Sequence, residues 1–293
     1  FNVRNRKAKL AGLPREDAFA FDEQGKIACV ADLVTKDFKD GTVLSKDFKG
    51  LIKARRGLYP DYSQAAEVCT SAFLDTKSLA EANKKIGFYN FQEDLIPTDY
   101  LAKDLAGCTA AGFWEDEGII NWSFICDSGI AIIGDNGKLK FKTSDEGPHS
   151  EGKNLYLESI VMENGGWNNP AARVAIRKEY RNNPEQFFSF GVLTGEKNAE
   201  KYIETGKEPV MSGDYVLAFT DGMADIIFNK NPRVISRYEL APRLNIDGNP
   251  EPPHVGLVIS PINQSFFNYL SQDNLSELKR FCQERVHSEG TLV

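Results

Sequence analysis

The stretch GDYVLAFTDGMAD, at residues 213–225, decides how the rest of this sequence is interpreted. Its apolar segment, Val216–Phe219, has the length and the β-leaning character of a buried strand. The carboxylate of Asp221 follows where this strand stops, and Gly222 and a second carboxylate, Asp225, come after it. Hard divalent cations prefer carboxylates that are held on rigid elements. An Asp-Gly pair after a strand is more often a simple turn, so the stretch indicates a metal site only if other strands end similarly.

Other predicted strands also start or stop at acidic residues. Asp32 and Asp127 each follow an apolar run, and Glu16 with Asp17 opens the first strand. If these strands pack in neighbouring sheets, their carboxylates meet at one edge, where mutual repulsion requires cations. Two divalent ions about 3.5–4 Å apart can hold a water molecule and activate it towards a phosphoryl group. This chemistry needs neither a histidine nor a cysteine nucleophile.

Tight turns join most of the predicted strands, which indicates antiparallel pairing. The Asn-Gly pair at 136–137, between two apolar runs, is the strongest of these hairpin signals. Helical spacing of apolar residues predicts helices that cover the sheets. We therefore expect an α+β fold of two packed antiparallel β-sheets flanked by helices, and one domain over residues 1–293. The expected hairpins span 18–31, 110–126 and 130–141, the helices 61–86, 171–181 and 264–285 with a break near 271–275, and a final strand 290–293.

Composition excludes several functional classes. The chain has 293 residues, 41% of them hydrophobic and 26% charged, as in ordinary globular proteins. Its formal charge of −7 argues against nucleic acid or an anionic membrane surface as a partner. The five cysteines form no Cys-x-x-Cys pair, which favours reduced thiols and a cytoplasmic location. We find no apolar run long enough to span a bilayer and no signal peptide.

Six short motifs resemble, in chain order, those of the metal-dependent protein phosphatase (PPM, type 2C) family. The segment VAD at 30–32 resembles the start of the family's Val-Ala-Asp-Gly-x-Gly-Gly element. CDSG at 126–129 resembles Gly-Asp-Ser-Arg, and residues 212–225 resemble the Gly-Asp…Ser/Thr-Asp-Gly motif. The remaining matches are PREDAF at 14–19, GCTAA at 107–111 and EGTLV at 289–293.

The resemblance implies an α-β-β-α sandwich that hydrolyses phosphate monoesters of phosphoserine and phosphothreonine in proteins. Two ions, Mn²⁺ or Mg²⁺, would activate a water molecule, with Asp32 and Asp221 as the central ligands. Asp127 and Asp225 would suit an auxiliary third ion, and the partner would be a phosphoprotein substrate. The implied metal set is Glu16, Asp17, Asp32, Leu33 through its backbone carbonyl, Asp127, Asp221, Asp225 and Glu289.

Several positions depart from the family pattern. Leu33 stands where the family has glycine, and Ser288 stands where a metal-binding aspartate is expected, one residue before Glu289. The phosphate-binding arginine of the family would fall at Gly12, and the adjacent Arg15, or Arg4 and Arg6 upstream, could substitute for it. These departures leave a second function open. In that alternative, the chain is a catalytically impaired member of the fold that acts as a binding module for a regulatory protein partner.

Overall fold

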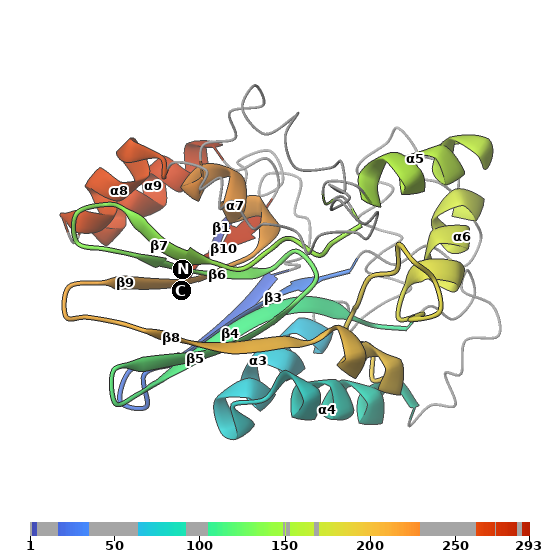
Figure 1. The fold of residues 1–293 in the computed structure, drawn as a ribbon, viewed down its shortest axis with the longest axis horizontal. Coiled ribbons are helices and arrows are strands. Elements are labelled where there is room, and N and C mark those ends of the chain that lie inside the picture. Colours follow the sequence, from blue (N-terminus) through green and yellow to red (C-terminus); the bar gives the residue numbers. More distant parts are fainter. Residues whose placement is uncertain are drawn as a thin grey trace, which may run out of the picture.

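The computed structural model describes residues 2–4, 17–34, 64–91, 105–148, 150, 153–166, 170–228, 262–272, 274–285 and 289–293. These residues form four layers, in which two antiparallel sheets pack face to face and helices cover both outer faces (Figure 1). The predicted α+β fold class of two packed antiparallel sheets flanked by helices is confirmed. That residues 1–293 form one domain stays a prediction.

The larger sheet has five strands in the order β2-β3-β4-β5-β8. Its first four strands are the two predicted hairpins. The edge strand β8 was not predicted, because its sequence ETGKEP contains no large apolar residue and its side chains are exposed or half-buried. The strands are β2 (Asp17–Asp22), β3 (Ile27–Leu33), β4 (Cys108–Asp116), β5 (Ile119–Ile125) and β8 (Glu204–Pro209).

The smaller sheet has three strands in the order β7-β6-β9. The strands β6 (Gly129–Ile133) and β7 (Leu139–Lys142) form the predicted hairpin, and β9 (Tyr215–Phe219) pairs with β6. The predicted final strand is also confirmed, since β10 (Glu289–Thr291) pairs with β1 (Asn2–Arg4). The backbone of Val293 then exchanges two hydrogen bonds with Ala218, at 2.9 and 3.0 Å, which ties the chain's last described residues to β9.

Helices cover each outer face of the sandwich, and a further pair lies at one end (Figure 1). The helical pattern predicted over 61–86 is confirmed over its described residues, where it is divided between two helices that meet at a short turn. The helix α5 was not predicted, since the apolar residues in its sequence KNLYLESIVME do not fall on one face. The helices are α3 (Gln64–Thr76) and α4 (Leu79–Phe91) on the larger sheet, α7 (Asp221–Ile227), α8 (Gln264–Ser271) and α9 (Leu275–Arg285) on the smaller, α5 (Lys153–Glu163) and α6 (Pro170–Tyr180) at the end, and the 3₁₀ helix η1 (Lys197–Tyr202).

The alternation of side chains along each strand determines what lies between the sheets. In β3, Cys29, Ala31 and Leu33 pack towards the helices, whereas Val30 faces the smaller sheet. Asp32 therefore points into the space between the sheets, at the end of the strand. The apolar core of this space is formed by Val30, Ala111, Phe124, Ile130 and Ala218.

The same alternation brings polar side chains from other strands to that end. In β2, Ala18 packs towards the helices, so its neighbour Asp17 faces between the sheets. Thr109 lies two residues before the inter-sheet residue Ala111, and Thr220 lies two residues after Ala218. One end of the inter-sheet space is therefore polar, although its middle is apolar.

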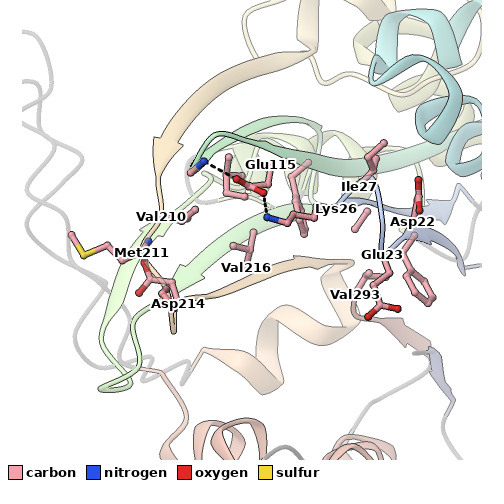
Figure 2. A pocket seen from close by; sticks show the side chains of 16 residues that line it. Asp22, Glu23, Lys26, Ile27, Glu115, Val210, Met211, Asp214, Val216 and Val293 are labelled. Carbon is pink, nitrogen blue, oxygen red and sulfur yellow. Dashed lines mark hydrogen bonds and ion pairs between the residues drawn. The ribbon is translucent and has the colours of Figure 1, made fainter.

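A hollow of about 570 Å³ lies at the opposite end of the sandwich, by the β2–β3 turn (Figure 2). Lys26 donates to Glu115 there, and the backbone N–H of Gly118 donates to the same carboxylate at 2.7 Å. The charge of Lys26 is thus already paired with a carboxylate. Asp17 and Asp32 lie at the other end of these strands, so this larger hollow takes no part in the chemistry of the predicted acids.

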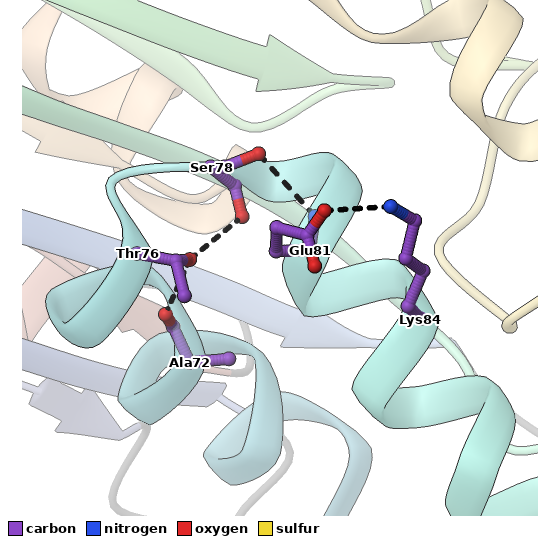
Figure 3. Close-up of polar contacts among 5 residues, drawn as sticks. All are labelled: Ala72, Thr76, Ser78, Glu81 and Lys84. Carbon is purple, nitrogen blue, oxygen red and sulfur yellow. Dashed lines mark hydrogen bonds and ion pairs between the residues drawn. The ribbon is translucent and has the colours of Figure 1, made fainter.

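The corner between α3 and α4 is held by side-chain caps (Figure 3). The hydroxyl of Thr76 donates to the carbonyl of Ala72 at 2.7 Å. The hydroxyl oxygen of Ser78 accepts the backbone N–H of Glu81 at 3.3 Å, so Ser78 caps the start of α4. Glu81 also accepts from Lys84 at 2.6 Å. These contacts end one helix and start the next within the stretch that the sequence pattern predicts to be helical.

We expect Ser78→Ala to lower the free energy of unfolding by about 1 kcal/mol, because the first turn of α4 loses its cap. Chemical denaturation monitored by circular dichroism measures the change. The matched control is Ser71→Ala on the exposed face of α3, where alanine is the better helix former and stability should not fall. Equal losses in both variants would show that Ser78 does not act as a cap.

Candidate active site

Asp17 and Asp32 lie directly opposite each other on the paired strands β2 and β3. Besides burial, the proximity of the Asp17 carboxyl raises the pKa of Asp32, which means that the two acidic groups lie close together. The hydroxyl of Thr220 also donates to Asp17 Oδ2 at 2.8 Å. Residues from β2, β3 and the end of β9 therefore meet at the polar end of the inter-sheet space.

The carboxyl of Asp32 has a pKa well above its usual range. Burial is the main cause, and the neighbouring negative charges of Asp17, Asp221 and Asp127 raise the pKa further. This pattern means that carboxylates from four separate elements lie close enough to repel each other. A divalent cation at this position would replace the proton and relieve the repulsion.

Asp127 lies in the turn that leads from β5 into β6. Cys126, just before it, has a positive φ of 71°, a backbone conformation that residues other than glycine rarely adopt. This turn directs Asp127 towards Thr109, whose hydroxyl is hydrogen-bonded to the Asp127 carboxylate and lies 2.9 Å from Ser128 Oγ. Asp127 Oδ1 is buried, and no protein donor satisfies it. A buried carboxylate oxygen without a donor is a ready ligand for a cation.

The pKa of Asp127 is raised to about 7. Burial is again the largest cause, followed by the negative charges of Asp221 and Asp145, and the hydrogen bond from Thr109 partly opposes them. Asp145 was not among the predicted site residues. It comes from the segment after β7, where periodicity is weak, and only the fold brings it beside Asp127.

Asp221 is the first residue of the short helix α7, with Thr220 as the residue before the helix. The alternative interpretation of Asp221-Gly222 as a simple turn is therefore wrong. Asp221 is exposed, and its charge reaches both Asp32 and Asp127. Asp225 lies one helical turn further on, is also exposed, and does not line the cavity that Asp221 lines.

A cavity of about 280 Å³ joins these acids to residues that the sequence analysis missed. Asp32, Asp127 and Asp221 lie on its wall, and so do Arg177 and Arg181 of the α6 region. A readable signal existed, because arginines recur at every fourth residue from 173 to 181 of the sequence, a spacing that predicts one face of a helix. Such a row is usually interpreted as a solvated face, whereas Arg177 and Arg181 are only 7% and 4% exposed.

The structure describes only some of the remaining predicted residues. Leu33 lines the cavity and is buried, and it pairs with Cys108 of β4 as part of a regular strand. Glu289 belongs to β10, whose backbone packs against α7 and β2, but its side chain lies outside the described residues. Glu16 and Ser288 also lie outside the described residues. Their predicted roles stay predictions.

The chemistry of the donors suits a hard divalent cation. Asp17, Asp32, Asp127 and Asp221 offer oxygen atoms only, and the unsatisfied Oδ1 of Asp127 is the strongest single indication. Within the part of the chain that the structure describes, no three histidine, cysteine, aspartate or glutamate side chains are arranged as a finished metal cage. The donor set therefore fits Mn²⁺ or Mg²⁺ in kind, and the carboxylates would have to move closer together to enclose an ion.

Known proteins with a similar architecture are metal-dependent phosphatases. Neither protein-family models nor curated proteins give a match to this chain. Among solved structures, the catalytic domain of the serine/threonine protein phosphatase PstP in complex with two manganese ions is similar, with a TM-score of 0.50 and 12% identity over 100% of this chain and 94% of that chain. A point mutant of a bacterial serine phosphatase gives a TM-score of 0.52 and 11% identity over the same shares. At these identities the likeness shows the fold, and the resemblance expected from the motifs is confirmed at that level.

We expect the metal-free protein to lose stability as the pH rises from about 4 to about 7. In the folded state, Asp127 keeps its proton up to about pH 7. In the unfolded chain, the same carboxyl loses its proton at about pH 4. The folded state thus binds more protons in this window, and the free energy of unfolding falls as the pH rises. Denaturant titrations at pH 5 and pH 8 in the presence of a chelator measure the slope.

Asp127→Asn should make this slope shallower, because the amide has no proton to lose. Asp116, the exposed last residue of β4, provides the control variant, Asp116→Asn, which should keep the wild-type slope. An unchanged slope in Asp127→Asn would contradict the assignment of a raised pKa to this carboxyl.

Proposed function

We propose that the chain is a metal-dependent phosphatase that removes phosphate from phosphoserine and phosphothreonine in proteins. One observation carries this proposal: carboxylates from four separate elements, Asp17, Asp32, Asp127 and Asp221, lie close enough to repel each other, and the last three line one cavity. Such a cluster is unfavourable unless cations or protons neutralise it. The fold shared with metal-dependent phosphatases supports the same conclusion.

In this proposal, Asp32 and Asp221 hold the ions. Two such ions, when bound, activate a water molecule and neutralise the charge that develops on the phosphoryl group. Asp17 lies opposite Asp32 and accepts a hydrogen bond from the hydroxyl of Thr220. This bond holds Asp17 in place, and Asp17 in turn orients the neighbouring carboxyl of Asp32. Thr109 does the same for Asp127. Carboxylates that are oriented before an ion binds lower the cost of ordering the site.

A second function, that of a non-catalytic binding module, is favoured by one specific observation. The described residues do not form a finished cage for a metal ion, and Leu33 continues a regular strand where the family has a glycine bend. In that case the protein partner would be bound without turnover. Metal affinity and turnover, measured on the same sample, separate the two functions.

The remaining expectations are proposals of the same kind. The partner would be a phosphoprotein, and the ions would be Mn²⁺ or Mg²⁺, with a third ion near Asp127. None of the described helices is long and apolar enough to cross a membrane. The cytoplasmic location stays a prediction from the cysteine pattern.

We expect Asp221→Asn to weaken Mn²⁺ binding by at least roughly 10- to 100-fold, the range that changes to outer-shell partners of metal ligands already produce. Hydrolysis of p-nitrophenyl phosphate should fall with it, because the site loses a negative charge that neutralises the ion. Isothermal titration calorimetry with MnCl₂ and a parallel rate measurement, repeated with MgCl₂, give both quantities.

The control variant is Asp135→Asn, at an exposed turn far from the acids at the other end of β6. It should bind Mn²⁺ and turn over substrate like the wild type. If wild-type protein binds neither ion, the catalytic proposal fails. If it binds ions tightly without turnover, the non-catalytic function is supported.

A further inference from the structure

Two buried arginines line the same cavity as the acids. Arg177 and Arg181 are 7% and 4% exposed, and the cavity wall that they share includes Asp32, Asp127 and Asp221. Burying a guanidinium group costs free energy unless hydrogen bonds and opposite charges compensate it. Both arginines interact with other groups of the protein, and their position on the cavity wall also places them within reach of a ligand bound in the cavity.

The backbone holds both arginines in defined positions. Arg177 lies in the last turn of α6, and Arg181 follows four residues later, directly after the helix; both line the cavity. Next to Arg181, the N–H of Phe190 donates to Tyr180 at 3.1 Å, and the N–H of Asn182 donates to Phe190 at 2.9 Å. Phe190 also lines the cavity. This bridge fixes the end of α6 against the cavity wall.

We propose that Arg177 and Arg181 bind the phosphate group of the substrate, a phosphate-monoester dianion at the end of a side chain. This inference rests on the proposed function. A guanidinium group presents a planar fork of donors that matches two phosphate oxygens, and it keeps its charge at all relevant pH values. The cavity then has one wall that holds cations through carboxylates and another that holds the anion through arginines.

The position of these arginines distinguishes this chain from the pattern that its motifs resemble. Gly12 stands where that pattern has its phosphate-binding arginine. The geometry assigns the phosphate contact to the end of α6 instead, 160 residues or more further along the sequence. A substrate bound between α6 and the acids would have its phosphorus atom next to the ions that the acids hold.

A competing role for the arginines can be separated by experiment. They would act as internal counter-charges for the carboxylates, in place of metal ions, if the chain were a non-catalytic module. In either role, removing an arginine takes a positive charge away from the acids and raises their affinity for cations. Only in the phosphate-binding role does removing an arginine also weaken the affinity for phosphate.

The test uses the full chain with Arg177→Ala, Arg181→Ala and the two corresponding lysine substitutions. Calorimetry measures the affinity for MnCl₂ and, separately, for inorganic phosphate, and turnover of a phosphothreonine peptide gives KM and kcat. We expect each alanine variant to lose about 10- to 100-fold in phosphate affinity, as for hydrogen bonds to a charged group, while its Mn²⁺ affinity equals or exceeds that of the wild type. The lysine variants should lose less, because they keep the charge without the fork.

Arg280→Ala is the matched control, because this arginine lies on α9 with its side chain 67% exposed and paired with Glu277. It should behave like the wild type in both titrations. Thermal unfolding verifies that each variant is folded, and if an alanine variant is not, the lysine variant at that position carries the test. Unchanged phosphate affinity in the Arg177 and Arg181 variants would overturn the inference.

The outcome is separable from that of the proposed function. Phosphate binding by the wild type is measured without metal as well as with it. If the wild type turns over substrate and the arginine variants do so equally well, the inference fails while the function stands. If no form binds Mn²⁺, the proposed function fails, and loss of phosphate binding in the arginine variants still supports the assignment.

Discussion

Repulsion between carboxylates held together in the space between the sheets is the constraint on which the rest of the site depends. Asp17 and Asp32 cannot move apart, because their strands are paired residue by residue in the larger sheet. Asp127 is directed to the same place by a turn with an unfavourable backbone conformation. Each of these groups is buried or close to other acids, so the metal-free state retains protons that acids in water would lose.

The surrounding elements hold this unfavourable cluster in position. Thr220 donates its hydroxyl to Asp17 although it stands at the start of a helix that it could cap. Thr109 is similarly bound to Asp127. The backbone of Val293 joins the last described residues to β9, next to the strand end that carries Thr220. The apolar core between the sheets fixes the two sheets relative to each other, and therefore fixes the positions of the acids at the polar end.

The distribution of charge around the cavity gives it two functional sides. The acids Asp32, Asp127 and Asp221 and the arginines Arg177 and Arg181 line one cavity. Carboxylates favour cations there, and guanidinium groups favour anions. A phosphate ester bound next to metal ions uses both. The larger hollow at the opposite end of the sandwich lacks this division, since its lysine is already paired with Glu115.

The sequence alone determined the hairpins, the two-sheet fold class and the acids at the strand ends, because tight turns and alternating apolar residues are local signals. It did not reveal β8 or α5, whose residues carry no one-sided apolar pattern and are placed by their neighbours. Asp145, Arg177 and Arg181 joined the site only in the tertiary structure. Their proximity to Asp127 and Asp32 comes from the packing of elements far apart in the chain, and no periodicity within one segment encodes a distance between segments.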